Sequence, residues 1–383
     1  MSSARFRILT QLLLLLILIP LSSVHAAAPI PSAPKIAGTG HLLIDYESNT
    51  ILAESNAGQR LEPASITKIM TAYAIFREIQ EGNIKLDDEV LISKKAWRAP
   101  GSRMFVEVNK KVSLELLLKG MIIQSGNDAS IALAEHVAGN EETFAALMNN
   151  HAARLEMDNT NFVNSTGLPH PDHYTTPRDI AKVAMATIRE FPEFYAWYAE
   201  KSMLFNKIKQ HNRNKLLWRD ESVDGMKTGH TEAAGYCLVA SAKRKDMRLI
   251  AIVMGTKSEQ ARAKETQTLL NYGFRFFETH RLYAAGEKLK QIRIWKGAKQ
   301  QLTLGLEKDL FVTIPRRQYK KLEAKMDIQN QIMAPVTKGE VMGSVTINLH
   351  GKLLAEVPLI ALEQVDAGSL WQKTKDSALL WLE

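Results

Sequence analysis

The sequence contains a single cysteine, Cys237, so an internal disulfide framework is excluded in this chain of 383 residues. Cys237 lies in an apolar stretch typical of a β-strand, where a free cysteine packs as a small hydrophobic side chain. The formal net charge is +8, but no block of basic residues interleaved with aromatic ones is present. Nothing therefore indicates nucleic-acid binding, and we interpret the charge as ordinary surface lysine and arginine rather than as a polymer-binding surface.

The sequence also lacks the His-Glu-x-x-His pattern of helical zinc peptidase sites. Two histidines, His170 and His173, stand close together, but Pro171 lies between them and favours a loop. We interpret this segment as a polar loop. The sequence predicts neither a metal nor another cofactor.

A long apolar run is missing as well, apart from Ile8–Leu21 near the N-terminus. This run follows two arginines, is too short to span about 30 Å of hydrocarbon comfortably, and ends in small residues. It predicts a signal peptide over residues 1–26, cleaved after Ala26, and hence an exported protein. Residues 27–37 are rich in alanine and proline and are expected to form an extended leader without chemistry.

Alternating apolar residues predict two strand pairs that lie far apart in the sequence. One is a hairpin over His41–Ala53, and the other joins Tyr236–Ala242 to Met247–Met254 through a basic turn. The segment between them has mostly helical patterns. Helix starts are expected at two capping residues, Ser113 and Thr176. Strands at both ends of a helical middle predict an α/β (α+β) domain over residues 38–277, closed by distant segments.

The pattern changes after Phe277, where short strands and a hairpin turn at His350-Gly351 predict a small all-β domain over residues 278–365. The final segment, residues 366–383, predicts a helix. Its apolar side carries Leu370, Trp371, Ala378, Trp381 and Leu382. We expect an amphipathic helix that anchors the protein in a membrane interface; the alternative is a helix packed on its own domain.

Ser65 and Lys68 open a helical run, three residues apart and therefore on one face of the helix. Amides at a helix N-terminus favour developing negative charge. A serine hydroxyl is a poor nucleophile until a base takes its proton, and a lysine serves as that base when burial or a nearby cation lowers its pKa. The Ser-x-x-Lys pattern is weak alone, since Ser32 and Lys35 match it within the proline-rich leader.

Two further elements strengthen the pattern, each occurring once and in the same order. Ser125-Gly126-Asn127 lies between two helical segments, and Lys227-Thr228-Gly229 comes before the strand predicted at Tyr236. Each alone could be an ordinary turn or strand start. Together with Ser65 and Lys68 they form the serine acyl-transferase set of β-lactamases and penicillin-binding proteins.

On these motifs, and on Val223–Thr231 and Tyr272–Thr279, the chain resembles the low-molecular-mass penicillin-binding proteins. It is similar to the D-alanyl-D-alanine carboxypeptidases of the penicillin-binding protein 5 and 6 type, which are serine peptidases of the S11 kind. The resemblance covers nearly the whole chain. It implies a β-lactamase/transpeptidase-like catalytic domain, and an enzyme at the periplasmic face of the bacterial inner membrane as a peripheral protein.

The resemblance also implies roles for the site residues. Ser65 would attack the carbonyl between two terminal D-alanines of peptidoglycan stem peptides, Lys68 would be its base, and Ser125 would relay a proton to the leaving amine. Substrate-binding roles would fall to Asn127, Lys227, Thr228, Gly229, His230 and Arg262. Of these, Thr228 and Arg262 would bind the terminal carboxylate, and the backbone amides of Ser65 and His230 would form the oxyanion hole. β-Lactam antibiotics would acylate the same serine.

Three alternatives remain. A β-lactamase would need a rapid deacylation step, for which class A members use a glutamate; the segment Asn164–Asp179 contains no glutamate. A D,D-endopeptidase would use the same residues on a peptidoglycan crosslink. A non-enzymatic protein would bind the cell wall through its β-domain while the site stays idle.

Overall fold

A computed structural model describes residues 30–381. The predicted signal peptide, residues 1–26, lies outside the described residues. The described part of the predicted leader has no helix or strand, and the first strand begins at Gly40.

An antiparallel five-stranded sheet forms the frame of the first domain, in the order β2-β1-β9-β8-β7. The two predicted strand pairs, β1–β2 and β8–β9, are both confirmed, and β1 pairs with β9 so that Leu43 lies opposite Ala251. The sheet is therefore closed by segments about 200 residues apart in the sequence, as the pattern predicted. Its strands are β1 (Gly40–Asp45), β2 (Ile51–Ser55), β7 (Val223–Thr231), β8 (Gly235–Arg244) and β9 (Met247–Thr256).

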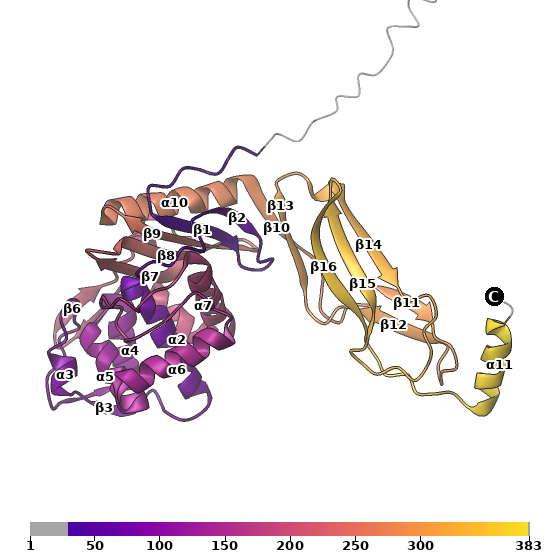
Figure 1. The fold of residues 1–383 in the computed structure, drawn as a ribbon, viewed down its shortest axis with the longest axis horizontal. Helices are drawn as coiled ribbons and strands as arrows, with labels where there is room; N and C mark the ends of the chain where they lie inside the picture. The colour runs from indigo at the N-terminus through magenta and orange to yellow at the C-terminus, as the bar shows by residue number, and fades with distance from the viewer. Residues whose placement is uncertain (1–29, 382–383) are drawn as a thin grey trace, which may run out of the picture. The chain divides into compact units, whose positions relative to one another are not determined.

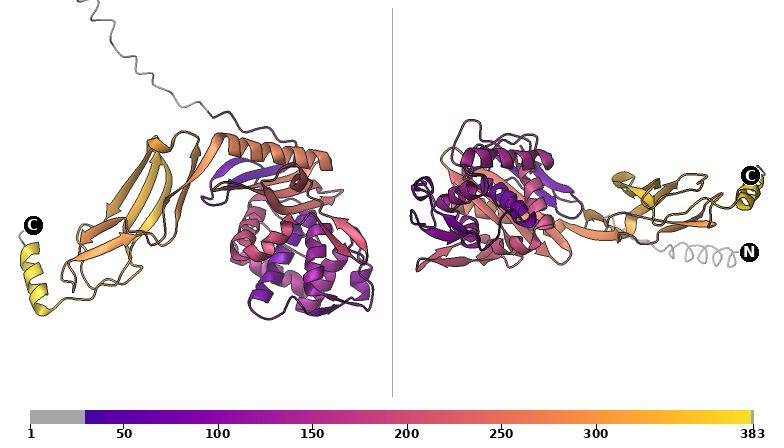
Figure 2. Two further views of the ribbon diagram at one scale, coloured as in Figure 1. Left: turned by 180° about the vertical axis from the view of Figure 1, so that it is seen from behind. Right: turned by 90° about the horizontal axis from the view of Figure 1, so that it is seen from below.

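Strand β9 shows how one sheet supports two cores. Its side chains alternate between faces: Leu249, Ala251 and Val253 join the cluster that contains Leu269 and Leu270 of α10 (Glu259–Phe276). Ile250, Ile252 and Met254 instead pack in the cluster formed with the helical segment. Figures 1 and 2 show α10 over one face of the sheet and α2, α4, α5 and α6 on the opposite side. Burial on both faces explains why residues 249–254 of this strand are all apolar.

Helix α2 (Lys68–Gln80) runs through the centre of the helical layer, and its residues from Lys68 to Phe76 are all buried. Its apolar side chains each contribute roughly 1.5–3 kcal/mol by leaving water, which offsets the cost of burying the Lys68 amine. Ser65 lies just before it in the 3₁₀ turn η1 (Ala64–Thr67), rather than within the α-helix itself. The other helices of this layer are α3 (Lys94–Trp97), α4 (Leu114–Lys119), the π-helical turn η2 (Gly120–Gln124), α5 (Asn127–Ala138), α6 (Glu141–Arg154), α7 (Pro177–Glu190), α8 (Pro192–Tyr195) and η3 (Ala196–Ala199). The short helix α9 (Leu216–Arg219) packs instead in the cluster that contains α10.

The two predicted helix caps have different outcomes. Thr176 caps α7 as expected, because its hydroxyl accepts a hydrogen bond from Asp179 N at 3.1 Å. Ser113 occupies the cap position of α4, but its side chain makes no capping hydrogen bond, and its backbone belongs to a small hairpin. Two short hairpins flank the helices: β3 (Glu89–Leu91) with β4 (Lys111–Ser113), and β5 (Ser202–Phe205) with β6 (Ile208–His211).

The predicted all-β segment is confirmed. A five-stranded sheet has the order β11-β12-β16-β15-β14, and a separate pair joins β10 to β13. The hairpin turn at His350-Gly351 links β15 to β16, with both residues at positive φ. Its elements are β10 (Phe277–Tyr283), β11 (Lys290–Arg293), β12 (Gln301–Gly305), β13 (Leu310–Pro315), η4 (Tyr319–Lys321), β14 (Leu322–Ile328), β15 (Val341–Leu349) and β16 (Lys352–Ala361).

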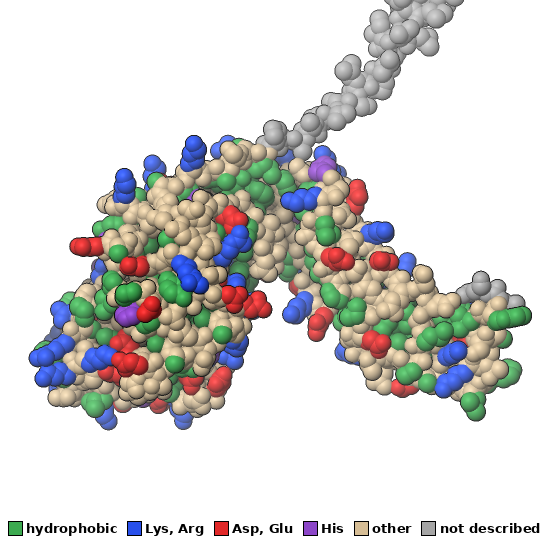
Figure 3. Space-filling view, viewed as in Figure 1, with side chains coloured by type: hydrophobic (Ala, Val, Ile, Leu, Met, Phe, Trp, Pro, Cys, Tyr) green, Lys and Arg blue, Asp and Glu red, His purple; other side chains and the backbone are tan. Residues whose placement is uncertain are grey.

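Helix α11 (Leu370–Leu380) follows the β-sheet and has no buried residue. Its exposed apolar side chains include Leu370 at 84%, Trp371 at 76% and, just past its end, Trp381 at 88%. Figure 3 shows hydrophobic side chains protruding where α11 lies. Over residues 30–381, no helix is long and apolar enough to cross a membrane.

Candidate active site

The three sequence elements come together around one cavity of about 280 Å³. Ser65 reaches it from η1, just before α2, Ser125 from the turn between η2 and α5, and Thr228 from β7 at the edge of the sheet. The cavity is lined by Ser65, Ser125, Arg213, Thr228, His230 and Arg262, among others. The juxtaposition of the motifs, which the sequence only implied, is thus a property of the fold.

Lys68 lies beneath this cavity with 1% of its surface exposed. Its Nζ is 3.1 Å from Ser65 Oγ, 2.7 Å from Asn127 Oδ1 and 2.6 Å from the carbonyl oxygen of Thr166. Burial lowers the pKa of Lys68 to about 7; Asp128 and Glu141 act in the opposite direction, and Arg213 lowers it further. The amine is therefore partly unprotonated near neutral pH, as a base must be.

The contacts of Lys68 also fix the direction of its free electron pair. A neutral amine has two N–H bonds and one electron pair. The oxygens of Asn127 and Thr166 can only accept hydrogen bonds, so they take the two hydrogens. The remaining electron pair then faces Ser65 Oγ, ready to take its proton.

Asn127 is held on both sides. Its Oδ1 accepts from Lys68, and its Nδ2 donates to the carbonyl of Pro100 at 2.6 Å. The adjacent Asp128, which the sequence reasoning did not single out, accepts hydrogen bonds from the backbone amides of Met104, Phe105, Val106 and Ala129. Asp128 thereby ties the loop after Pro100 to the start of α5. In this arrangement the amide of Asn127 orients Lys68.

Lys227 and Ser125 form the opposite wall. Lys227 is 2% exposed, and its Nζ donates to Ser125 Oγ at 2.8 Å and to the carbonyl of Thr228 at 3.1 Å. Burial, followed by the nearby charge of Lys68, holds the pKa of Lys227 well below its ordinary value. Ser125 has φ of 67°, a left-handed conformation that costs energy for a non-glycine residue and turns its hydroxyl toward Lys227.

Residues 227–229 lie in the middle of β7, a strand that the sequence analysis did not predict as a separate element. Thr228 and Gly229 are buried, whereas His230 is exposed and stacks on Tyr236 with 3.9 Å between ring centroids. Arg262, on α10, is 4% exposed and donates to the carbonyl of Gly229 at 3.0 Å. The structure therefore places Arg262 at the cavity, where distance in sequence alone gave little support.

Arg213 is a second cation at the cavity. Its Nε donates to the carbonyl of Gln124 at 3.1 Å, which ties it to the segment that precedes Ser125. With Arg262 it gives the cavity two guanidinium groups, against one acidic lining residue, Glu259.

The His170–His173 segment is a loop, as the sequence predicted, but the side chain of His173 is buried within the protein. This side chain is 2% exposed; its Nδ1 accepts from Val163 N at 3.1 Å, and its Nε2 lies 2.8 Å from Thr67 Oγ1. Because Nδ1 accepts, Nε2 carries the hydrogen and donates to Thr67. Burial lowers the pKa of His173 to about 4.

No carboxylate of the 164–179 segment faces Ser65. The side chain of Asp172 is 76% exposed, and Asp179 accepts from Asn159 N and Thr160 Oγ1 at the start of α7. Cys237 is fully buried, as predicted, and burial raises its pKa to about 11. Among residues 30–381, no group of three or more histidine, cysteine, aspartate or glutamate side chains is placed to hold a metal ion.

Comparison with known proteins gives matches over nearly the whole chain. Residues 27–258 match the D-alanyl-D-alanine carboxypeptidase family, peptidase S11, and residues 277–367 match the C-terminal domain of penicillin-binding protein 5. The chain is 44% identical to D-alanyl-D-alanine carboxypeptidase DacC of Escherichia coli over 363 residues, which is 93% of this chain and 91% of that protein.

Solved structures give the same result. Penicillin-binding protein 5 of Haemophilus influenzae superposes with a TM-score of 0.84 at 41% identity, covering 89% of this chain and all of that one. Penicillin-binding protein D2 of Listeria monocytogenes, solved in an ampicillin-bound form, has a TM-score of 0.59 at 26% identity and covers 64% of this chain and all of that one.

Proposed function

The chain belongs to the D-alanyl-D-alanine carboxypeptidase family of low-molecular-mass penicillin-binding proteins, and from that premise we propose that Ser65 is its nucleophile and Lys68 its general base. The protein is a serine-type D-Ala-D-Ala carboxypeptidase on which penicillin acts. The observation that carries the residue assignment is the distance of 3.1 Å between Lys68 Nζ and Ser65 Oγ. Lys68 is buried, and the two hydrogens of its neutral amine are already taken by the oxygens of Asn127 and Thr166.

In the acylation step, Lys68 Nζ takes the hydroxyl proton of Ser65, and Oγ bonds to the carbonyl carbon of the penultimate D-alanine. The negative charge that develops on the carbonyl oxygen is stabilised by the backbone amides of Ser65 and His230. The C–N bond then breaks and the terminal D-alanine leaves with a proton that passes from Lys68 through Ser125. The contact of Ser125 with Lys227 keeps the hydroxyl oriented for this relay.

In the deacylation step, water attacks the ester carbon of the acyl-enzyme while Lys68 takes a proton from it. The C–O bond to Ser65 breaks, Oγ recovers its proton from Lys68, and the shortened peptide leaves with a new carboxylate. The 164–179 segment presents no carboxylate to Ser65 that could assist this water, since Asp172 is exposed and Asp179 is held at the start of α7. A β-lactam acyl-enzyme should therefore be long-lived on this protein.

The cations of the cavity support a preference for a free peptide end. Arg262 and Arg213 line the cavity beside the hydroxyl of Thr228, and a terminal carboxylate would find two guanidinium groups and a donor there. Asn127, Lys227 and Gly229 complete the substrate-binding set.

Mass spectrometry after incubation with penicillin tests the assignment. We expect one penicilloyl adduct on the Ser65 peptide, absent from the Ser65→Ala variant. Product analysis on a stem pentapeptide and on a crosslinked dimer separates the two activities: free D-alanine from the pentapeptide with little cleavage of the dimer is expected. Equal cleavage of both would mean that the enzyme is also an endopeptidase, and a wild-type protein without an adduct would refute the serine mechanism.

The proposed setting is the periplasmic face of the inner membrane, with a cleaved signal peptide, a catalytic domain over residues 38–277, a β-domain over 278–365 and α11 in the lipid interface. The support for the interfacial helix is its orientation. Asp376, on its polar side, accepts from Lys296 N at 2.6 Å and pairs with Arg293, whereas Leu370, Trp371 and Trp381 are exposed. Two exposed tryptophans on one side suit a headgroup region.

Flotation of the whole protein with anionic vesicles tests the interfacial helix. The Trp371→Ser/Trp381→Ser double variant should lose vesicle binding, whereas the polar-side control Lys373→Ser should retain most of it. Both should hydrolyse soluble pentapeptide normally. Equal binding by the double variant and the wild-type protein would remove the helix as the anchor.

A further inference from the structure

Residues 164–168 form a tight loop that presents one carbonyl to the general base. Asn164 Oδ1 accepts hydrogen bonds from Thr166 N, Thr166 Oγ1 and Gly167 N, and this bends the loop. Gly167 has φ of 81° and lies so close to Ala64 that any side chain there would overlap the carbonyl of Ala64. The loop is thus pressed against the turn that carries Ser65, with the Thr166 carbonyl on Lys68 Nζ.

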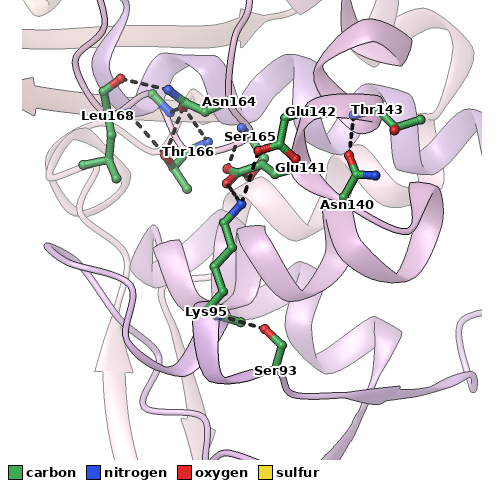
Figure 4. A network of polar contacts seen from close by, with 12 residues as sticks. Ser93, Lys95, Asn140, Glu141, Glu142, Thr143, Asn164, Ser165, Thr166 and Leu168 are labelled. Atoms are coloured by element: carbon green, nitrogen blue, oxygen red, sulfur yellow. Dashed lines mark hydrogen bonds and ion pairs between the residues drawn. The ribbon is translucent and has the colours of Figure 1, made fainter.

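A second element, α6, holds this loop from behind (Figure 4). Glu141, its first residue, is 8% exposed, and its Oε1 accepts from Ser165 Oγ at 2.8 Å and from Ser165 N at 3.1 Å. The carbonyl of Ser165 accepts in turn from Thr71 and Ser130, at 2.7 and 2.8 Å. Every polar group of Ser165 is therefore engaged, immediately before the residue that contacts Lys68.

The other carboxylate oxygen of Glu141 is also fixed. Its Oε2 lies 3.1 Å from Lys95 Nζ on α3, and this lysine reaches the exposed Glu142 only at 3.8 Å. The carboxylate is thus clamped between a lysine and the loop. This arrangement is more specific than a negative charge at a helix N-terminus requires, since any acidic residue in the first turn would satisfy the helix dipole.

The geometry points to Glu141 as a positioning residue for the general base: through Ser165 it holds the Thr166 carbonyl on Lys68, and so aims the free electron pair of Lys68 at Ser65. The inference rests on the proposed role of Lys68. If the carbonyl moved away, one N–H of Lys68 would lose its acceptor and could turn toward Ser65 Oγ, where it would donate a hydrogen bond in place of accepting the proton.

The charge of Glu141 gives the inference a second readout. The charged groups that act on Lys68 come from several elements: Asp128 and Glu141 raise its pKa, and Arg213 lowers it. Lys227 and His173 are also within its electrostatic reach. Removing the charge of Glu141 should therefore lower the pKa of Lys68 and move the acid limb of the acylation rate to lower pH.

The experiment measures the second-order rate of acylation by a fluorescent penicillin between pH 5 and 9 for four variants of the full chain. Glu141→Gln keeps an oxygen acceptor for Ser165 but loses the charge, so its plateau should stay near the wild-type value. Its acid limb should move down by roughly half a pH unit. Glu141→Ala loses both, so its plateau should also fall roughly 10- to 100-fold.

The remaining two variants separate positioning from general destabilisation. Ser165→Ala keeps the charge of Glu141 but loses the hydrogen bond from the Ser165 hydroxyl. The plateau of its acylation rate should therefore fall, while the acid limb should stay at the wild-type pH. Glu142→Gln is the matched control, with the same chemical change on the neighbouring exposed residue, and should match the wild type in both. Thermal melts establish that each variant is folded. If Glu141→Ala does not fold, the positioning role of Glu141 is tested by Glu141→Gln and Ser165→Ala alone.

The positioning role is overturned if Glu141→Gln and Ser165→Ala both superimpose on the wild-type profile, or if Glu142→Gln shifts the limb as far as Glu141→Gln does. Failure of the proposed function has a different signature. In that case the wild-type protein itself shows no adduct on Ser65, or shows an acylation rate that does not fall as the pH is lowered.

Discussion

Lowering the pH from 8 to 6 should slow acylation of the wild-type enzyme about tenfold. Lys68 must be unprotonated to accept the Ser65 proton, and its pKa is about 7 because the amine is buried. At that pKa about 90% of the amine is neutral at pH 8 and about 10% at pH 6. An ordinary exposed lysine, with a pKa of about 10.4, would be less than about 1% neutral at pH 8 and its rate would still climb tenfold per pH unit.

Stopped-flow mixing with a fluorescent penicillin gives the rate at each pH, and peptide mapping at both extremes verifies that the label is on Ser65. Melting curves across the same range exclude unfolding as the cause of any loss. His173 does not interfere, since its pKa is about 4 and it stays neutral throughout. A rate that is flat from pH 5 to 8, or one that keeps rising tenfold per unit through pH 9, would refute a buried Lys68 as the base.

Three further predictions concern buried groups. Lys68→Met should abolish acylation without lowering the melting temperature, because it removes a buried amine and keeps the length of the side chain; acylation at the normal rate would count against the base. Iodoacetamide at pH 8 should leave pentapeptide hydrolysis intact, because Cys237 is buried with a raised pKa; rapid inactivation that tracks alkylation of Cys237 would contradict its burial. Gly167→Ala should cost roughly 1–3 kcal/mol or more in urea denaturation, because its positive φ and the contact with Ala64 leave no space for a side chain; unchanged stability would mean that the loop is not pressed against η1.

The parts of the site that could be predicted from the sequence are those that depend on short spacings. Ser65 and Lys68 are three residues apart, and Ser125-Gly126-Asn127 forms a turn between helices, so both could be recognised locally. The hairpins at β1–β2 and β8–β9 were predicted for the same reason, since alternation is visible within one strand pair. Strand β7 was missed because its polar residues, including Lys227, interrupt any alternating pattern.

The remaining site residues act through contacts that sequence spacing does not reveal. Glu141 is the first residue of a helix, so its position suggests only a favourable charge at the helix N-terminus, yet its partner Ser165 lies 24 residues away. The burial of His173 could not be predicted, because its hydrogen-bond partner Thr67 lies 106 residues away in the sequence.

The pairing of β1 with β9 has a consequence for how the enzyme is made. Both strands of the first pair, β1 and β2, are synthesised early, but β9, the central strand that pairs with β1, is complete only at residue 256. A ribosome-bound or truncated chain that ends before β9 cannot close the sheet or seat β7 beside η1, and its Lys68 would stay hydrated and charged. The extent of labelling by fluorescent penicillin would then report the fraction of chains that have closed the sheet, since only these chains can react.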